Sequence, residues 1–278
     1  MTSQSMTAAS TPAESTPAES TPAASTSAAS TPAASMPAAS TSAASGTGAV
    51  STVTLSAGDE HSFQAYVSRP ARPNGRAIVI LQEIFGVTHA IRDVADRYAA
   101  EGYLALAPDL FWRIRPGIEL SHSKEDIALA FEALKQFDES LAVQDIARVV
   151  DYAHQEVGPD APVAVLGMCL GGKLAYLCAT RIDVDAAVSF YGVGIEKNLD
   201  EADRVACPLL LHIGARDTYI DATAREQIAH TLATRPDVTL HVYEEAGHGF
   251  YTRETSTSRE TAHTRTTAFL DASLGGAP

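Results

Sequence analysis

The chain has 278 residues, 45% of them hydrophobic, and a formal net charge of −14. This acidic balance argues against nucleic acid and an anionic membrane surface as partners, and no apolar run approaches the length of a membrane span. The three cysteines include no CxxC pair, which argues against a zinc site or a redox pair and favours the cytoplasm as location.

The N-terminal segment has a low-complexity composition. Serine recurs every five residues from Ser5 to Ser45, with no aromatic and almost no branched aliphatic side chains between. Such a segment cannot bury enough apolar surface to offset the entropy lost on ordering. We therefore predict a disordered tail over residues 1–48, either a spacer or a dispensable extension, and one domain over residues 49–278. Without a basic start or a continuous apolar core, the tail is not expected to be a secretory signal.

Short apolar runs alternate with amphipathic stretches through the domain. Residues 51–69 alternate in polarity and predict an antiparallel hairpin at a sheet edge. Buried strands are predicted at 77–81, 104–107, 163–166, 186–190, 209–213 and 238–243. Helical spacing marks 91–98 and a long middle stretch from 127 to 153. The fold class is therefore α/β, a mostly parallel central sheet with helices on both faces. Its chemistry is expected outside the carboxyl ends of the strands.

A strand–turn–helix pattern surrounds Cys169. The apolar run of residues 163–166 leads directly into Gly-Met-Cys-Leu-Gly-Gly, a nucleophile elbow with cysteine in the usual position of serine. The N–H groups of the following helix would favour negative charge on a thiolate or a reacting oxygen. A buried structural thiol is the alternative, but the surrounding pattern favours a nucleophile. Cys178 and Cys207 have no such motif and are interpreted as packing residues.

Two further strand ends carry candidate partners for Cys169. Asp217 follows the strand at 209–213, and His248 lies between two glycines after the strand at 238–243. Alone, each could be a loop cap or a surface histidine. Together the order nucleophile, acid, base is that of the α/β-hydrolase fold. His212 lies in an apolar strand and is interpreted as a core residue. The remaining histidines have no evident partner: His61, His89, His122, His154, His230, His241 and His263.

Glu83 directly follows the strand at 77–81. A carboxylate at the end of a buried strand is costly unless it is paired, so Glu83 is either a capping or salt-bridged residue or a group that contacts the nucleophile. The backbone N–H groups of Ile84 and Leu170 are the candidate oxyanion donors.

Five motifs carry a resemblance to a known family. Gln-Glu-Ile-Phe-Gly-Val, Ala-Pro-Asp-Leu-Phe, Gly-Met-Cys-Leu-Gly-Gly, Ser-Phe-Tyr-Gly-Val-Gly and Ala-Gly-His-Gly-Phe occur in this order. Over residues 51–274 the chain resembles the dienelactone hydrolase (carboxymethylenebutenolidase) family. The resemblance implies a triad of Cys169, His248 and Asp217. It also implies that Glu83 hydrogen-bonds the resting thiol and takes its proton when substrate binds.

The resemblance also implies substrate-binding residues. Arg113 matches the first of two arginines expected to bind a substrate carboxylate. The second is expected four residues after the histidine, where this chain has Thr252, with Arg253 one position later. Tyr191, in the Ser-Phe-Tyr-Gly-Val-Gly motif, is a further candidate.

The expected function is opening of a small-molecule lactone or ester through a thioester acyl-enzyme. A dienelactone-like substrate would give an oxo-dicarboxylic acid such as maleylacetate. No metal or organic cofactor is expected to be needed, and the protein is expected to be a monomer or small homo-oligomer. The alternatives are a general carboxylesterase of the same family and a non-catalytic binding protein that keeps the fold. A thiol redox protein is disfavoured because the motif lacks a resolving cysteine.

Overall fold

The computed structural model describes residues 47–58 and 60–275. The predicted tail, residues 1–48, lies outside the described residues except for its last two. These two are the first residues of strand β1 (Thr47–Ser56). The following strand, β2 (Ser62–Pro70), pairs antiparallel with β1, as the alternating pattern predicts.

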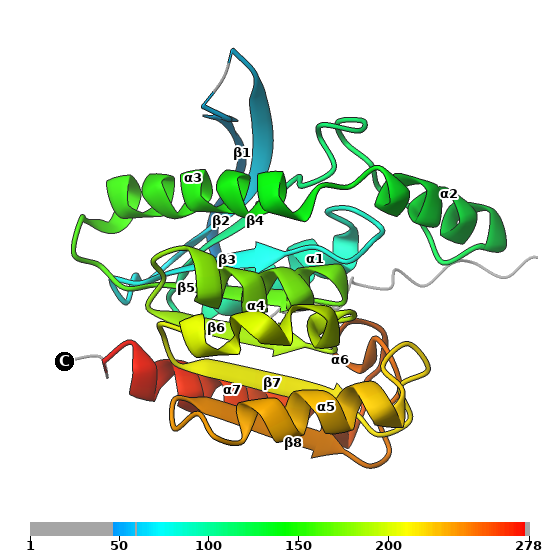
Figure 1. The fold of residues 1–278 in the computed structure, drawn as a ribbon. Coiled ribbons are helices and arrows are strands. Elements are labelled where there is room, and N and C mark those ends of the chain that lie inside the picture. Colours follow the sequence, from blue (N-terminus) through cyan, green and yellow to red (C-terminus); the bar gives the residue numbers. More distant parts are fainter. Residues whose placement is uncertain (1–46, 59, 276–278) are drawn as a thin grey trace, which may run out of the picture. The chain divides into compact units, whose positions relative to one another are not determined.

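The domain is built on an eight-stranded sheet in the order β1-β2-β4-β3-β5-β6-β7-β8 (Figure 1). Its remaining strands are β3 (Ala77–Leu81), β4 (Leu104–Pro108), β5 (Val163–Met168), β6 (Ala186–Phe190), β7 (Leu209–Gly214) and β8 (Val238–Tyr243). These six strands run parallel, and β2 joins β4 antiparallel. Each strand from β3 to β7 is buried along its whole length, which explains why these sequences are apolar apart from Ser189 in β6 and His212 in β7.

Helices cover both faces of the sheet (Figure 1). On one face, α3 (Glu139–Val157) packs on α4 (Leu170–Arg181), which contacts the 3-10 helix η1 (Ile195–Arg204), and η1 in turn contacts α5 (Ala222–Leu232). On the other, α6 (Phe250–Arg253) lies between α1 (His89–Ala100) and α7 (Thr257–Ser273). The predicted α/β-hydrolase architecture is confirmed. No helix among residues 47–58 and 60–275 is long and apolar enough to cross a membrane.

The long middle stretch with helical spacing forms two helices. Helix α2 (Lys124–Lys135) ends before Asp138, whose side chain accepts hydrogen bonds from the N–H groups of Ser140 and Leu141 and so caps the start of α3. Helix α2 stands at the margin of the domain (Figure 1). Only two of its residues, both alanines, are buried. The larger apolar side chains of α2, which form a stripe at Ile127, Phe131 and Leu134, therefore do not belong to the core of the sheet.

Candidate active site

Cys169 lies on a sharp turn between β5 and α4. Its backbone has φ 55° and ψ −113°, a conformation that non-glycine residues rarely adopt and that costs about 1–3 kcal/mol. Two backbone hydrogen bonds hold the turn: the N–H of Cys169 donates to the carbonyl of Phe190 at 3.0 Å, and that of Gly171 donates to the carbonyl of Gln82 at 3.0 Å. The turn is therefore fixed to the neighbouring strands β6 and β3.

Glycine is required on both sides of the cysteine. A Cβ atom on Gly167 would overlap the backbone of Gly171, and one on Gly171 would overlap the carbonyl of Leu81 at the end of β3. The elbow thus packs backbone against backbone, as the motif predicts.

Asp217 and His248 form a hydrogen-bonded pair. The Asp217 Oδ2 atom lies 2.8 Å from His248 Nδ1, and both side chains are buried. The other Asp217 oxygen accepts hydrogen bonds from the N–H groups of Tyr219 at 2.8 Å and Ile220 at 3.2 Å. With Nδ1 held by the carboxylate, Nε2 is the ring nitrogen left for proton transfer.

A cavity of about 270 Å³ brings the predicted residues together. Cys169 and His248 line it, and so do Ile84 and Leu170, the predicted oxyanion donors. Asp217 does not line the cavity but is hydrogen-bonded to His248, which does. The structure therefore places Cys169, His248 and the two residues predicted to supply N–H donors around one space large enough for a small ester.

Glu83 lies beside this cavity in a buried position, with its side chain 3% exposed. It accepts a hydrogen bond from Thr252 Oγ1 at 3.3 Å, and Arg253 Nη2 lies 3.7 Å from the same oxygen. Burial raises the pKa of Glu83 above its ordinary value, and the charges of Arg253 and His248 with the Thr252 hydrogen bond only partly oppose this. Glu83 is therefore a more basic carboxylate than one in water.

The resting thiol of Cys169 is protonated. Burial and the nearby Glu83 charge raise the pKa of Cys169 to about 12, and the N–H of Leu170 with the Arg253 charge only partly offsets them. The N–H of Leu170 lowers the pKa of the thiol, the direction predicted for the helix N–H groups, but burial dominates. The hydrogen bond expected between Glu83 and this thiol is also not among the contacts of the described residues, where Glu83 bonds Thr252 instead.

Arg253 reaches the cavity, and Thr252 turns away from it. Gly249 caps the start of α6 with φ 78°, so the helix begins two residues after His248, and the Arg253 guanidinium folds back over the space that a Gly249 side chain would fill. Thr252, at the position expected for arginine, bonds Glu83 and lies 3.2 Å from the Tyr191 hydroxyl. Arg253, one position after the place where the resemblance expects an arginine, therefore lines the cavity.

Two predicted substrate-binding residues are not brought to the cavity. Arg113 pairs with buried Asp145 through Nη2 at 2.8 Å and stacks on the ring of Trp112, 4.2 Å away. The ion pair with Asp145, a residue distant in sequence, sets the direction of the Arg113 side chain. The position of Arg113 shortly after β4 is therefore not enough to bring it to the cavity. Tyr191 is fully buried with φ 39°, and its ring packs 4.9 Å from that of His248. Tyr191 therefore packs against the His248 ring and does not line the cavity.

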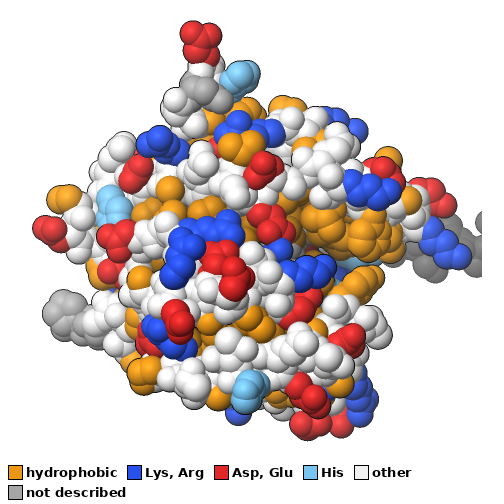
Figure 2. Space-filling model, in the orientation of Figure 1, with side chains coloured by type: hydrophobic (Ala, Val, Ile, Leu, Met, Phe, Trp, Pro, Cys, Tyr) orange, Lys and Arg blue, Asp and Glu red, His pale blue; other side chains and the backbone are white. Residues whose placement is uncertain are grey.

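Most of the cavity wall was not predicted from the sequence. Its apolar side consists of Phe85, Ile127, Phe131, Leu134, Phe137 and Val193. The stripe of α2 thus faces the cavity, and Figure 2 shows hydrophobic side chains gathered where α2 meets the rest of the domain. The periodicity predicted the helix but could not tell a cavity wall from a core contact.

Polar cavity residues were missed as well. Lys173, Lys197, Glu139, Tyr219 and His122 line the cavity. Lys173 had a sequence signal, because a residue four positions after Cys169 lies on the same helix face. Burial and the Arg253 charge lower the pKa of His122, which packs on Phe85.

Other histidines and cysteines lie outside the cavity. His263 was left without a partner in the sequence but bonds Tyr251 and Glu101, at 2.8 and 2.7 Å. His89 pairs with Asp93 at the surface. His212 is a buried core residue, as predicted, and so are Cys178 and Cys207. Within the described residues, no cluster of three or more His, Cys, Asp or Glu is placed to hold a metal ion.

The parallel sheet, the strained elbow and the Asp–His pair at neighbouring strand ends together define an α/β-hydrolase. Residues 63–273 match the model of the dienelactone hydrolase family. The chain belongs to this family, and it is an enzyme that hydrolyses carboxylic esters or lactones.

Individual relatives agree with this assignment. The chain is 37% identical to a carboxymethylenebutenolidase of Pseudomonas putida over 71% of this chain and 84% of the relative. It is 35% identical to one of Rhodococcus opacus over 64% and 71% of the two chains. A solved structure from Klebsiella pneumoniae, whose name points to a dienelactone hydrolase, superposes with a TM-score of 0.69 at 29% identity, covering 80% of this chain and 98% of that one.

Proposed function

We propose that the protein opens a lactone or ester by nucleophilic attack of Cys169, with a thioester acyl-enzyme as intermediate. The observation that carries the proposal is the Asp217–His248 pair, 2.8 Å apart, facing the same cavity as a cysteine on a strained elbow. A structural thiol would have no need of a backbone conformation that raises the energy of the fold.

In acylation, a base must first remove the thiol proton, because the pKa of the resting Cys169 is raised to about 12. Glu83 is the base we assign, since burial raises its pKa and its charge lies close enough to act on the thiol. The thiolate sulfur attacks the carbonyl carbon, and the carbonyl oxygen becomes an oxyanion near the N–H groups of Ile84 and Leu170. As the C–O bond breaks, His248, which enters this step as the imidazolium paired with Asp217, donates its Nε2 proton to the leaving alcohol or enol oxygen and becomes neutral.

In deacylation, neutral His248 removes a proton from a water molecule that attacks the thioester carbonyl. Asp217 stabilises the imidazolium that forms. The C–S bond then breaks, the acid leaves, and protonated Glu83 returns to the thiolate the proton that it took in acylation. His248 remains as the imidazolium for the next cycle. Every step uses groups on the chain itself.

The names of the relatives suggest the substrate. Carboxymethylenebutenolidases are named for a lactone, so a dienelactone-like substrate, with an oxo-dicarboxylic acid such as maleylacetate as product, is the first candidate. A general carboxylesterase activity is the second, favoured by the apolar cavity wall and by the position of Arg113 away from it.

Turnover of a cis-dienelactone and of a neutral aryl ester by Cys169→Ala and Cys169→Ser tests the proposal. We expect the alanine variant to lose turnover of both and the serine variant to be far slower than wild type, because this site ionises a hydroxyl even less readily than a thiol. Cys207→Ala is the matched control, since Cys207 is as buried as Cys169 and lies outside the cavity. Wild-type turnover by Cys169→Ala would refute the mechanism.

A further inference from the structure

The cavity has a cationic character that contrasts with the acidic protein. Among the described residues that line it, Lys173, Lys197 and Arg253 are cationic and only Glu139 is acidic. The whole chain carries a net charge of −14. A local excess of positive charge in a low-dielectric cavity favours an anionic ligand group.

Lys173 is the cation most firmly fixed at the nucleophile. It lies one helical turn after Cys169, and its N–H donates to the Cys169 carbonyl at 3.2 Å. Its side chain is 9% exposed and runs beside Gly194. Its position on α4 therefore keeps the ammonium at the cavity wall, on the helix face that presents the cysteine.

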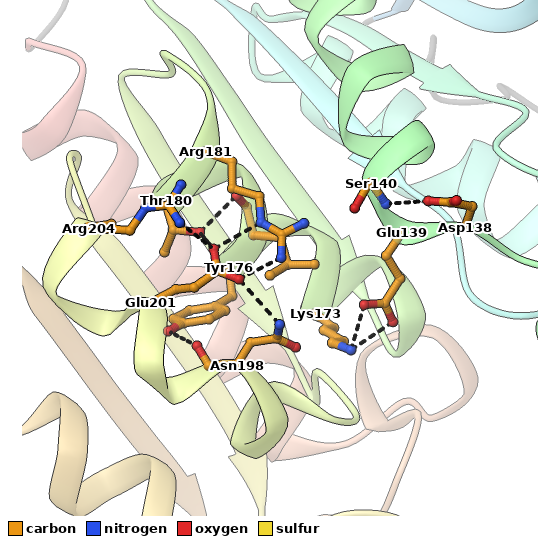
Figure 3. A network of polar contacts seen from close by, with 11 residues as sticks. Asp138, Glu139, Ser140, Lys173, Tyr176, Thr180, Arg181, Asn198, Glu201 and Arg204 are labelled. Atoms are coloured by element: carbon orange, nitrogen blue, oxygen red, sulfur yellow. Dashed lines mark hydrogen bonds and ion pairs between the residues drawn. The ribbon is translucent and has the colours of Figure 1, made fainter.

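The partner of Lys173 is more exposed than Lys173 itself. Both Glu139 carboxylate oxygens lie 2.7 Å from Lys173 Nζ, and the Glu139 side chain is 34% exposed (Figure 3). A buried ammonium needs a counter-ion, whereas a carboxylate that is one-third exposed can turn into water at small cost. The lysine is therefore the fixed member of the pair and the carboxylate the exchangeable one.

From this geometry we infer that Lys173 determines specificity by binding an anionic group of the substrate, which replaces Glu139 as its counter-ion. Lys197, exposed at the same cavity, adds charge without a fixed position. The substrate class is an ester or lactone bearing a carboxylate several bonds from the reacting carbonyl. The inference rests on the proposed reaction at Cys169, and it assigns to Lys173 the role that the sequence analysis gave to Arg113.

Two matched esters test the inference: the mono-4-nitrophenyl ester of adipic acid, which carries a carboxylate, and the neutral 4-nitrophenyl hexanoate. The readout is the ratio of kcat/KM for the charged ester to that for the neutral one. We expect Lys173→Met to lower this ratio about tenfold, mostly through KM, because a charge-assisted contact is lost. Lys173→Arg should retain most of the ratio.

Glu139→Gln gives a result of opposite sign. Removing the competing carboxylate frees Lys173, so we expect the KM for the charged ester to fall and the ratio to rise. If the Lys173–Glu139 ion pair were merely structural, loss of either partner would change the ratio of kcat/KM values in the same direction. Lys135→Met, in a surface pair with Glu132, is the matched control and should leave the ratio as in wild type. Arg113→Met should affect both esters equally.

An unchanged ratio in Lys173→Met would overturn the inference, and so would a lower ratio in Glu139→Gln or a selective loss of the charged ester in Arg113→Met. A failure of the proposed reaction looks different, because Cys169→Ala would then retain turnover of the neutral ester. Melting temperatures of all variants report whether the fold is intact.

Discussion

Cys169 shows how a residue's chemistry depends on its neighbours in space. Its place in the motif predicts the elbow, and the structure has it there with φ 55°. The motif does not report how deeply the sulfur lies or that Glu83 is close to it. These two effects outweigh the N–H of Leu170 and raise the pKa of the thiol to about 12. The nucleophile is thus stored as a thiol and needs a base before it reacts.

Glu83→Gln tests that base and has a pH-dependent consequence for stability. Because burial raises the pKa of Glu83 in the folded state, ionised Glu83 opposes folding at neutral pH. This penalty is absent below the unfolded pKa of about 4.5 and develops as pH rises through the folded pKa. We expect Glu83→Gln to melt at a higher temperature than wild type at pH 7, to lose that advantage toward pH 4, and to acylate more slowly.

Thermal melts at both pH values and pre-steady-state acylation rates provide these measurements. Thr252→Val is the control, since it removes the hydrogen bond to Glu83 but keeps the carboxylate. A Glu83→Gln enzyme with wild-type acylation would show that another group takes the thiol proton.

At the level of elements, the strands were predictable and the cavity wall was not. The runs at 77–81 and 186–190 coincide with β3 and β6, because a strand buried between two helical layers must be largely apolar. The run at 238–243 forms β8, but the prediction that it is a buried strand is wrong: β8 is the last strand of the sheet, and among its residues only Tyr243 is buried. The residues after β3, β5, β7 and β8 could then be placed at one sheet edge, which gave Glu83, Cys169, Asp217 and His248. Side-chain directions such as those of Arg113 and Lys173 depend on contacts with distant residues, which a single sequence does not reveal.

The packing of the elbow leaves no room for a side chain at Gly171. We expect Gly171→Ala to lower the free energy of unfolding by at least about 1–3 kcal/mol, since the added methyl group would overlap the Leu81 carbonyl. Urea titration measures the change. Gly247→Ala is the control for stability, because the nearest atom to its added Cβ would be 3.9 Å away. Equal stability of the two variants would show that the elbow relaxes more freely than the structure implies.

For the whole molecule, we propose that residues 1–46 contribute neither to the core nor to the site. Their composition offers no apolar face to bury. A chain that begins at Thr47 keeps β1 whole and should match the full chain in melting temperature and in kcat/KM for a neutral aryl ester. A loss of several degrees or of most activity would mean instead that this segment binds the domain.

The most direct test of the account is to identify the residue that carries the acyl group during turnover. A His248→Ala enzyme, which lacks the base for deacylation, is mixed with excess aryl ester, quenched in acid and analysed by intact and peptide mass spectrometry. The account predicts one acyl adduct, on the peptide containing Cys169, that hydroxylamine removes and that is absent from a Cys169→Ala, His248→Ala double variant. An adduct on another residue, or release of the aryl alcohol by the double variant at the rate of His248→Ala, would contradict it.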